Sequence, residues 1–315
     1  MSDHENTYKY SAVIPVFNSE AIVGDTIDRT VAFFEAHNLD YELIMVNDGS
    51  SDGSWEVVRN RAESHSRIIA IDLLRNYGQH NAVFCGLQHS TGDYMITLDD
   101  DLQNPPEEII HLIKKIQLGY DVVFGRFRIK EHAGYRRAGS RAIALVNRQV
   151  FHYPKDLAIT NFRIMRRDVV DRMINYRTSY PYIQGLALMF SSKRANVWVE
   201  HQPRPVGKSN YNWWRIGSLV MRILFNYSAF PMHAVTTIGV IVSVFSLLLG
   251  LFFVLRAVFV GVSVPGWTTV VVLLSFFNGI NLIIMSMLGE YIIRLVNTVS
   301  SKESYHIRQI VRSDD

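Results

Sequence analysis

Residues 94–106 read YMITLDDDLQNPP, in which a short strand-like run ends in three adjacent carboxylates. Neighbouring carboxylates repel one another unless solvent or a divalent cation neutralises their charge. Hard oxygen ligands of this kind suit Mg²⁺ or Mn²⁺, which in turn bridge a diphosphate. Because alternate strand residues share a face, Asp99 and Asp101 are predicted to face a metal and diphosphate site, with Asp100 pointing away. The alternative is an acidic helix N-terminus favoured by the helix dipole.

The residues around this run predict an α/β fold. Helical patterns of apolar residues alternate with short β-branched or aromatic runs over the first 125 or so residues. The strand-like runs are 10–16, 41–47, 68–74, 94–98 and 121–124. Such alternation predicts a mostly parallel, doubly wound sheet, on which ligands bind at the carboxyl ends of strands. Beyond it, a weaker pattern predicts helices at 136–151, 167–175 and 182–190 and a strand at 196–201.

Polar motifs follow the first two strands. In PVFNSE (15–20), Phe17 offers a flat face to a base and Glu20 an acceptor for ribose or base donors, although such a run is often only a loop. In NDGSSDG (47–53), Asp48 lies where the sheet presents ligand groups, and its carboxylate is able to accept from a uracil N–H or a ribose hydroxyl. The alternative for this second motif is a turn and helix N-cap.

The last quarter of the chain predicts a membrane hairpin. Residues 234–256 and 268–289 are apolar, and about 20 such residues cross the hydrocarbon core of a bilayer. Lys and Arg flank this pair but are absent from the turn between the spans, which places both termini in the cytoplasm by the positive-inside rule. Two tryptophans and two arginines among apolar residues in 212–231 predict an interfacial helix, with a packed core helix as the alternative.

These patterns divide the chain into a cytoplasmic α/β domain (1–211), an interfacial helix (212–231), two membrane spans (232–290) and a cytoplasmic tail (291–315). The polar first ten residues lack the apolar core of a secretory signal, so the N-terminal part is expected to stay in the cytosol. The chain has 315 residues and one cysteine, so an internal disulfide is excluded.

Together the motifs resemble a known family. PVFNSE, VNDGSSDGS and LDDDLQNPPEEI resemble glycosyltransferase family 2, whose members have the inverting GT-A fold. LRNYGQ (74–79), GKSNY (207–211) and GEYI (289–292) resemble its polyprenyl-phosphate branch. That branch includes dolichyl-phosphate mannosyltransferases, bactoprenol glucosyltransferases and the aminoarabinose transferase of lipid A modification. The resemblance implies transfer from a nucleotide-sugar, UDP-linked, to undecaprenyl phosphate at the cytoplasmic face of the inner membrane, for cell-envelope modification.

The resemblance also implies roles for individual residues. Pro15, Phe17, Glu20 and Asp48 would hold the nucleotide. Asp99 and Asp101 would bind the metal and manage the diphosphate, with Gln103 near the donor sugar. The residues implied to hold phosphate groups are Arg75, Arg163, Arg204, Lys208 and Ser209. A guanidinium fork suits a phosphate, but a basic patch that faces anionic lipid is the alternative.

Two residues depart from the branch. Asp100 stands where Ala is common, and Asn161 stands where many bacterial members carry an Asp that is interpreted as the catalytic base. Asn cannot take a proton. A phosphate monoester, however, has a second pKa near 6, so the acceptor is already largely a dianion at pH 7 and needs orientation more than deprotonation. Asp156 is the candidate substitute for the missing base.

Other functions stay open. The rival hypotheses are a non-catalytic sugar-nucleotide-binding membrane subunit, which Asn161 alone supports, and a transferase to another acceptor such as a growing polysaccharide. The sequence does not select the sugar. No nucleic-acid partner is expected, whereas a flippase for lipid-linked sugar and a downstream transferase are expected functional links. Small residues in the spans would permit contacts in a homo-oligomer, namely Gly239, Ser243, Gly279 and Ser286.

Overall fold

The computed structural model describes residues 8–127, 145–178, 180–202, 213–228, 230–261, 266–299 and 305–313. It forms two compact units, the first made of Met1–Ser218 with Lys302–Asp315 and the second of Leu219–Ser301. Three residues implied to hold phosphate, Arg204, Lys208 and Ser209, lie outside the described residues, as does most of the helix predicted at 136–151.

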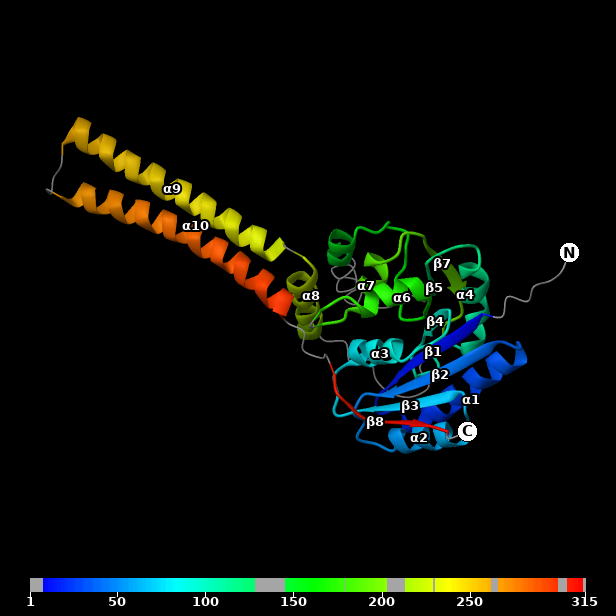
Figure 1. The fold of residues 1–315 in the computed structure, drawn as a ribbon. Coiled ribbons are helices and arrows are strands. Elements are labelled where there is room, and N and C mark those ends of the chain that lie inside the picture. Colours follow the sequence, from blue (N-terminus) through cyan, green and yellow to red (C-terminus); the bar gives the residue numbers. More distant parts are fainter. Residues whose placement is uncertain are drawn as a thin grey trace. The chain divides into compact units, whose positions relative to one another are not determined.

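The first unit contains a mixed, mostly parallel sheet of eight strands in the order β7-β5-β6-β4-β1-β2-β3-β8 (Figure 1). The strands are β1 (Lys9–Val16), β2 (Asp40–Asn47), β3 (Ile68–Leu73), β4 (Tyr94–Thr97), β5 (Val122–Phe127), β6 (Arg163–Arg166), β7 (Arg194–Val199) and β8 (Ile307–Arg312). β1 pairs in parallel with β2 and β4, β2 with β3, and β5 with β7. The predicted α/β fold is confirmed, with each expected strand present within about two residues of its predicted bounds at most ends.

Helices pack on both faces of this sheet, so its central strands are buried on both sides. One face carries α1 (Glu20–Ala36), α2 (Ser54–Ser64), the 3₁₀ turn η1 (Pro106–Glu108) and α4 (Ile109–Ile116). Apolar residues of α1, α2 and α4 form one core with alternate residues of β1 and β2. The opposite face carries α3 (Gln79–Gln88), with α6 (Arg167–Ile174) and α7 (Ile183–Met189) packed beside it. A Cβ on Gly86 of α3 would lie only 2.3 Å from a methyl group of Val13, so this helix needs glycine to approach β1.

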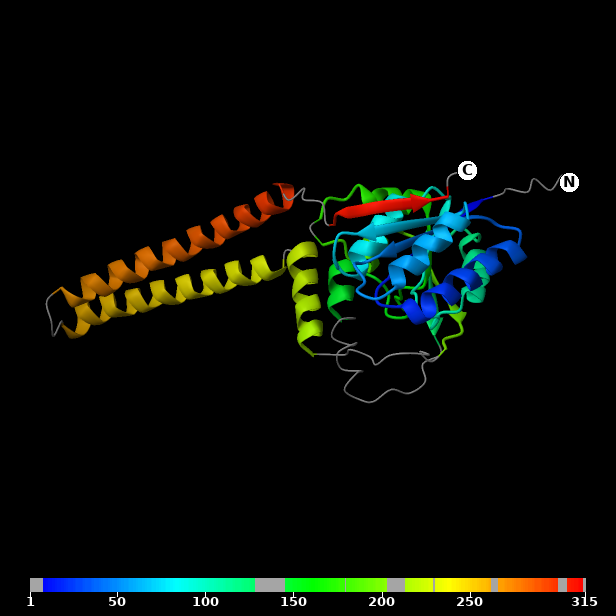
Figure 2. The ribbon, with the colours of Figure 1, turned by 90° about the horizontal axis from the view of Figure 1, so that it is seen from below.

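Two strands were not expected from the sequence. β6 runs antiparallel between β4 and β5, and β8 runs antiparallel to β3 at the sheet edge. Figures 1 and 2 both show β8, in red, alongside β3. Residues 307–312, which belong to the predicted cytoplasmic tail (291–315), are therefore a strand of the sheet.

The second unit is dominated by two long helices, α9 (Phe230–Val260) and α10 (Trp267–Val299), which follow α8 (Trp213–Tyr227). Their segments Thr237–Arg256 and Thr269–Ile293 are long and apolar enough to cross a membrane. Many of their large apolar side chains are exposed, which is unlike the core helix of a globular domain.

Small residues allow α9 and α10 to approach each other closely. A Cβ on Gly279 would lie 2.7 Å from the hydroxyl oxygen of Ser243, and one on Gly239 would lie 3.0 Å from that of Ser286. These are the small residues that the sequence suggests for contacts in a homo-oligomer. In the structure they form the seam between the two helices of one chain, as expected where van der Waals packing holds helices together in a membrane.

Candidate active site

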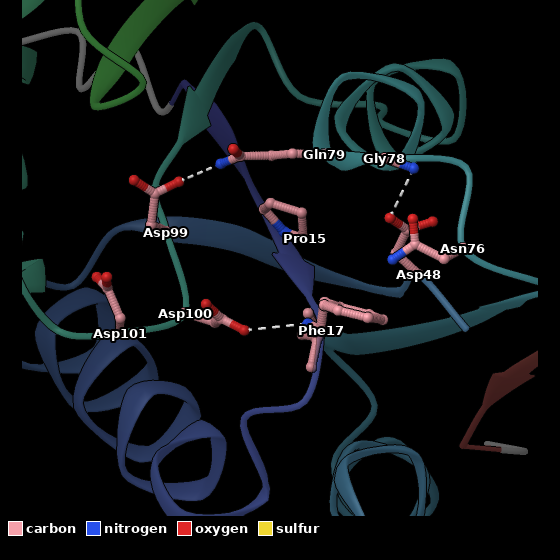
Figure 3. A pocket seen from close by; sticks show the side chains of 10 residues that line it. Pro15, Phe17, Asp48, Asn76, Gly78, Gln79, Asp99, Asp100 and Asp101 are labelled. Carbon is pink, nitrogen blue, oxygen red and sulfur yellow. Dashed lines mark hydrogen bonds between the residues drawn. The ribbon is translucent and has the colours of Figure 1, made fainter. Parts of the chain in front are cut away.

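A cavity of about 310 Å³ lies at the carboxyl ends of β1, β2 and the segment after β4, next to the N-terminus of α3. Figure 3 shows the side chains that surround it. The lining residues are Pro15, Val16, Phe17, Asp48, Asn76, Gly78, Gln79, Asp99, Asp100 and Asp101. The motifs that follow three separate strands in the sequence therefore meet in one pocket, as a doubly wound sheet requires.

The acidic run is a loop and not a continuation of β4, which ends at Thr97. All three carboxylates line the pocket (Figure 3). The prediction that Asp100 points away is therefore wrong. Its reason was the alternation of side chains along a strand, which does not apply to residues beyond the strand end; Leu102 already has the left-handed backbone of a turn, with φ of 54°.

Asp100 joins the acidic loop to the N-terminus of α1. Its Oδ2 accepts hydrogen bonds from the Phe17 amide at 3.2 Å and from the Ser19 hydroxyl, and its backbone carbonyl accepts from the Thr26 hydroxyl at 3.0 Å. Burial raises the pKa of Asp100, against the opposing effect of the bonds from Ser19 and Phe17. Asp100 thus holds the loop that presents the Phe17 ring to the pocket.

Asp99 is held by two side-chain amides. Its Oδ1 accepts from Gln79 Nε2 at 2.5 Å and from Asn161 Nδ2 at 3.4 Å. Burial raises the pKa of Asp99 to about 6, and the charges of Asp101 and Asp100 add to this increase. A carboxylate in such surroundings gains from any positive charge that enters the pocket.

The amide of Asn161 is oriented by a chain of buried and partly buried hydrogen bonds. Asn147 Nδ2 donates to the Tyr182 oxygen at 2.8 Å, and the Tyr182 hydroxyl donates to Gln184 Oε1 at 2.7 Å. Gln184 Nε2 then donates to Asn161 Oδ1 at 3.0 Å, which leaves Asn161 Nδ2 to donate to Asp99. Burial raises the pKa of Tyr182 to about 12, so its hydroxyl keeps the proton that fixes this direction. Asn161 is a hydrogen-bond donor to Asp99.

Arg163 supplies a buried positive charge beside this network. Its side chain is 1% exposed, its Nε donates to the Thr97 hydroxyl at 3.0 Å, and its Nη1 has no hydrogen-bond partner among the described residues. Burial lowers the pKa of Arg163 to about 10, against the opposing attraction of Asp99, so the guanidinium stays charged at neutral pH. Loss of solvent around the His80 ring lowers its pKa to about 4, and Arg163 adds to this effect, so His80 is neutral.

The opposite side of the pocket is built on Asp48. Its two carboxylate oxygens accept from the backbone N–H groups of Tyr77 at 2.7 Å and Gly78 at 2.8 Å. Figure 3 shows the bond from Gly78. Burial raises the pKa of Asp48 to about 6, although these two bonds oppose the increase. The Phe17 ring is 46% exposed beside it, so a flat apolar face is open to a ligand.

Several predicted site residues do not line this cavity. Glu20 is exposed and accepts from the Gly53 backbone N–H at 3.0 Å, which ties α1 to the loop before α2. The guanidinium of Arg75 lies 5.2 Å above the centre of the Tyr77 ring. Glu20 therefore connects two elements, and Arg75 packs on a ring of its own loop.

Gln103 and Asp156 are also outside the set that lines the cavity. Gln103 donates its backbone N–H to Asp101 Oδ1 at 3.1 Å, so it helps to close the acidic loop. The Asp156 side chain is exposed, and its contact with Arg126 is made through the backbone carbonyl. No described contact connects Asp156 with Asp99.

Comparison with known proteins identifies the family. A sequence model described as "Glycosyl transferase family 2" matches residues 11–174, slightly more than half of the chain. The chain belongs to glycosyltransferase family 2. The resemblance inferred from the motifs is thereby confirmed, and the pocket is that of a transferase of this family.

Similar full-length transferases have a more specific name. The undecaprenyl-phosphate 4-deoxy-4-formamido-L-arabinose transferase of Proteus mirabilis (strain HI4320) is 35% identical over 99% of this chain and 96% of its own. The protein of the same name from Photorhabdus laumondii is 36% identical over 98% of this chain and 95% of its own. These similarities reach from the first strand through the apolar helices to β8, and they confirm the polyprenyl-phosphate branch.

Solved structures confirm the GT-A fold of this glycosyltransferase. Glucosyl-3-phosphoglycerate synthase from Mycobacterium tuberculosis, in complex with Mn²⁺, UDP and phosphoglyceric acid, superposes with a TM-score of 0.51 at 17% identity, covering 69% of this chain and 76% of that one. The same synthase with Mg²⁺ and UDP also gives 0.51, at 16% identity, covering 69% and 77%. In these two complexes the synthase is accompanied by UDP and a divalent cation.

The acidic loop suits a divalent cation that is coordinated jointly by the protein and by substrate phosphates. The described residues contain no group of three or more His, Cys, Asp or Glu side chains placed together as a complete metal site. Mg²⁺, however, is commonly held by one or two carboxylates, with substrate phosphates and water completing its coordination. Asp99 and Asp101 supply two such carboxylates in one pocket.

Proposed function

We propose that this family 2 glycosyltransferase transfers a sugar from a UDP-linked donor to undecaprenyl phosphate, with inversion at the anomeric carbon. The proposal of a nucleotide-sugar donor rests on one observation: Asp48, Phe17 and the acidic loop line the same cavity. The acceptor half is supported by the full-length relatives, which are named for undecaprenyl phosphate.

In this proposal the two sides of the cavity divide the donor between them. Pro15, Phe17 and Asp48 hold the nucleoside, with the base against the Phe17 ring and a donor group on the Asp48 carboxylate. Asp99 and Asp101 face the diphosphate and would hold Mg²⁺ or Mn²⁺. A bound cation there supplies neutralising charge for the leaving nucleoside diphosphate.

The acceptor needs no protein base in this reaction. A lipid phosphate is largely a dianion at pH 7, so one of its oxygens attacks the anomeric carbon as the bond to the diphosphate breaks. The products are the nucleoside diphosphate and a polyprenyl-phosphate sugar. Asn161 contributes by holding Asp99, and Arg163 contributes a fixed positive charge near it. Arg75, Arg204, Lys208 and Ser209 stay candidates for binding phosphate, Glu20 for the nucleotide, Gln103 for the donor sugar and Asp156 for a weak substitute base.

The first sugar to test is 4-deoxy-4-formamido-L-arabinose. Its support is the shared name of the similar full-length transferases, which are 33% to 36% identical to this chain. A product of this kind forms on the cytoplasmic side, so a flippase for lipid-linked sugar and a downstream transferase would have to act after it. Assembly into a homo-oligomer is an additional proposal, to be measured as the mass of the purified enzyme.

The proposed location is the cytoplasmic membrane of a bacterium, with two spans and both termini in the cytoplasm. Its support is the length and exposure of α9 and α10 together with the Lys and Arg residues that flank them in sequence. In this arrangement 1–211 is the catalytic part, 212–231 an interfacial helix and 232–290 the spans. A reporter fused after Asp315 should read cytoplasmic, and one inserted at 261–266 should read external; the reverse result would reject the topology.

The function is tested with the purified full-length enzyme, undecaprenyl phosphate and Mg²⁺ or Mn²⁺. The donors are UDP-4-deoxy-4-formamido-L-arabinose, UDP-glucose and UDP-N-acetylglucosamine, and the lipid product is identified by mass spectrometry. We expect a sugar-phosphate lipid from the first donor, and its rate of formation should fall at least about 100-fold in Asp99→Asn. Sugar transfer to another acceptor alone would reject the acceptor. Tight UDP binding without turnover of any donor would favour the non-catalytic subunit.

A further inference from the structure

The strand β8 follows the second apolar helix in sequence, yet it completes the sheet at the edge that leads to the nucleotide part of the cavity. It pairs antiparallel with β3, with Ile310 opposite Ile71 and Gln309 opposite Asp72. In both Figure 1 and Figure 2 it lies along β3 over most of its length. β3 ends at Leu73, and the loop 74–78 that follows it contributes Asn76 and Gly78 to the cavity.

Arg308 of β8 makes two contacts at the end of β3. Its Nη1 lies 2.9 Å from Asp72 Oδ2, and its Nη2 donates to the Leu74 carbonyl at 2.9 Å. The Asp72 side chain is only 1% exposed, so its charge depends on partners such as this. The Leu74 backbone N–H donates to the His306 carbonyl at 2.9 Å, so both backbone groups of Leu74 are held by this C-terminal segment.

Asp72 passes this restraint on to the loop that carries Asp48. Its Oδ1 accepts from Asn47 Nδ2 at 2.7 Å, and Asn47 Oδ1 accepts from the Ser50 N–H at 3.3 Å. Asn47 is the last residue of β2 and directly precedes Asp48. One buried carboxylate therefore connects the C-terminal strand with the Asp48 loop.

The Asp48 loop and the loop 74–78 are also fixed against each other. Asp48 accepts from Tyr77 and Gly78, and the backbones come so close that a Cβ on Gly49 would lie 2.4 Å from the Arg75 carbonyl carbon. Gly49 has φ of 64°, which also favours glycine. These contacts provide a route by which a displacement of Leu74 would reach the carboxylate of Asp48.

We propose that β8 is part of the site that binds the nucleoside diphosphate, and that Arg308 is a positioning residue for it. Arg308 acts through Asp72 and Leu74, which hold the two loops around Asp48. This inference rests on the proposed function for the identity of the ligand. It implies that 1–211 alone is not a complete binding unit, because the sheet edge and the Asp72 charge are satisfied by residues beyond the apolar helices.

The test compares Arg308→Ala with Arg312→Ala in the full-length enzyme. Arg312 lies on the same strand and is exposed, and its side chain shows no hydrogen bond or ion pair with any described residue. It is therefore a matched control for loss of one charge. Binding of UDP in the presence of Mg²⁺ is measured by calorimetry. We expect the Kd to rise about tenfold for Arg308→Ala, because a charged hydrogen-bond pair at a buried carboxylate is lost, and to stay within about twofold for Arg312→Ala.

The KM values for the two substrates distinguish a positioning role of Arg308 from a general loss of structure. The KM for the sugar donor should rise with the Kd for UDP, while the KM for undecaprenyl phosphate should stay unchanged. Arg308→Lys keeps a positive charge beside Asp72 but loses the hydrogen bond to the Leu74 carbonyl. Its Kd for UDP should therefore lie between those of the wild type and Arg308→Ala. It also serves as the informative variant if Arg308→Ala does not fold, as judged by thermal melting.

Hydrogen exchange of the ligand-free enzyme tests the structural step without reference to the ligand. Backbone amides of the loop 74–78 should exchange faster in Arg308→Ala than in the wild type and Arg312→Ala. Equal exchange and equal Kd values in all three proteins would overturn the inference. If the wild type binds no nucleotide, the proposed function fails by itself; faster loop exchange would then still support the positioning role, and unchanged exchange would reject it.

Discussion

The two sides of the cavity hold their central carboxylates with different kinds of hydrogen-bond donor. On the nucleotide side, which comprises Pro15, Phe17, Asp48, Asn76 and Gly78, the central carboxylate is held by backbone N–H groups. On the acidic side, which comprises Asp99, Asp100, Asp101 and Gln79, the central carboxylate is held by side-chain amides. Burial raises the pKa of Asp48 and of Asp99 to about 6, so burial alone does not distinguish them.

The difference between their partners indicates different tasks. Backbone donors are fixed by the fold and suit a group that must stay in place, as in recognition of a nucleoside. Side-chain amides can rotate away when a cation or a diphosphate arrives, and the adjoining like charges favour that exchange. We therefore expect substitutions on the acidic side to change the rate of transfer, and those on the nucleotide side to change binding.

The largest effect is expected from Asp99→Asn. The amide removes a charge that a cation on the diphosphate would need, and removal of one electrostatic contact at a transition state commonly costs about 100-fold to 1,000-fold in rate. Binding of uridine, which has no phosphate, should be unchanged. The measurements are kcat and the uridine Kd. A variant that retains full kcat, or a wild type that retains full activity in excess chelator, would remove the acidic side from the chemistry.

Asp48→Asn should have the opposite effect, weaker nucleotide binding with little change in kcat. The new amide N–H₂ would face the N–H of Tyr77 or Gly78, so one hydrogen bond is replaced by two opposed donors. We expect the Kd for uridine and the KM for the donor to rise about tenfold, with kcat at saturating donor nearly unchanged. Calorimetry and steady-state kinetics at several donor concentrations would show this. A large loss of kcat at saturating donor would reject the hypothesis that the nucleotide side serves binding and the acidic side serves transfer.

The fold and the division of the cavity follow from the sequence to different extents. The central strands are continuous apolar runs because both of their faces are buried, and the polar motifs at their ends, such as the run around Asp48, mark the ligand-binding edge. β6 and β8 lack this signal. β6 carries Arg163 and Arg166 in four residues, and β8 reads IRQIVR without strict alternation, so neither resembles a buried strand.

The sequence also fails to predict several side-chain contacts within the site, for a different reason. The chain of contacts from Tyr182 through Gln184 and Asn161 to Asp99 joins segments that are far apart in sequence. Arg308 and Asp72 are 236 residues apart. Only the folded sheet brings such residues together, and a single glutamine on a predicted helix gives no indication of its partner. LRNYGQ is a recognisable motif, but nothing in it indicates that Gln79 contacts Asp99.

A smaller effect is expected from Asp100→Ala, and it tests a corrected prediction. Alternation along a strand implied that this residue points away and is dispensable. Its bonds to Phe17 and Ser19 now connect the acidic side with the nucleotide side. We expect about a fivefold rise in donor KM through loss of these hydrogen bonds, with Asp100→Asn closer to the wild type because it keeps an acceptor oxygen. Wild-type KM in Asp100→Ala would restore the original interpretation.

The last substitution, Asn161→Asp, asks whether the acidic side contains a missing base. In the structure the Asn161 amide donates to Asp99 and accepts from Gln184. An aspartate there would still accept from Gln184, but it would lose the donor to Asp99 and place another carboxylate beside three existing ones. The substitution should therefore slow the reaction rather than improve it.

The size of this loss is limited by the chemistry of the acceptor. A hydroxyl nucleophile needs a base matched to the working pH, whereas a phosphate that is already ionised does not. We therefore expect kcat of Asn161→Asp to fall by no more than about tenfold, or 1.4 kcal/mol of barrier. Asn161→Ser is the control, because it removes the amide without adding charge; it should lie between the wild type and Asn161→Asp. Turnover with undecaprenyl phosphate at pH 7.5 decides between the two views. If the wild type is inert with every donor and Asn161→Asp is active, the base is essential, and the amide at position 161 marks a protein that binds the nucleotide-sugar without transferring it.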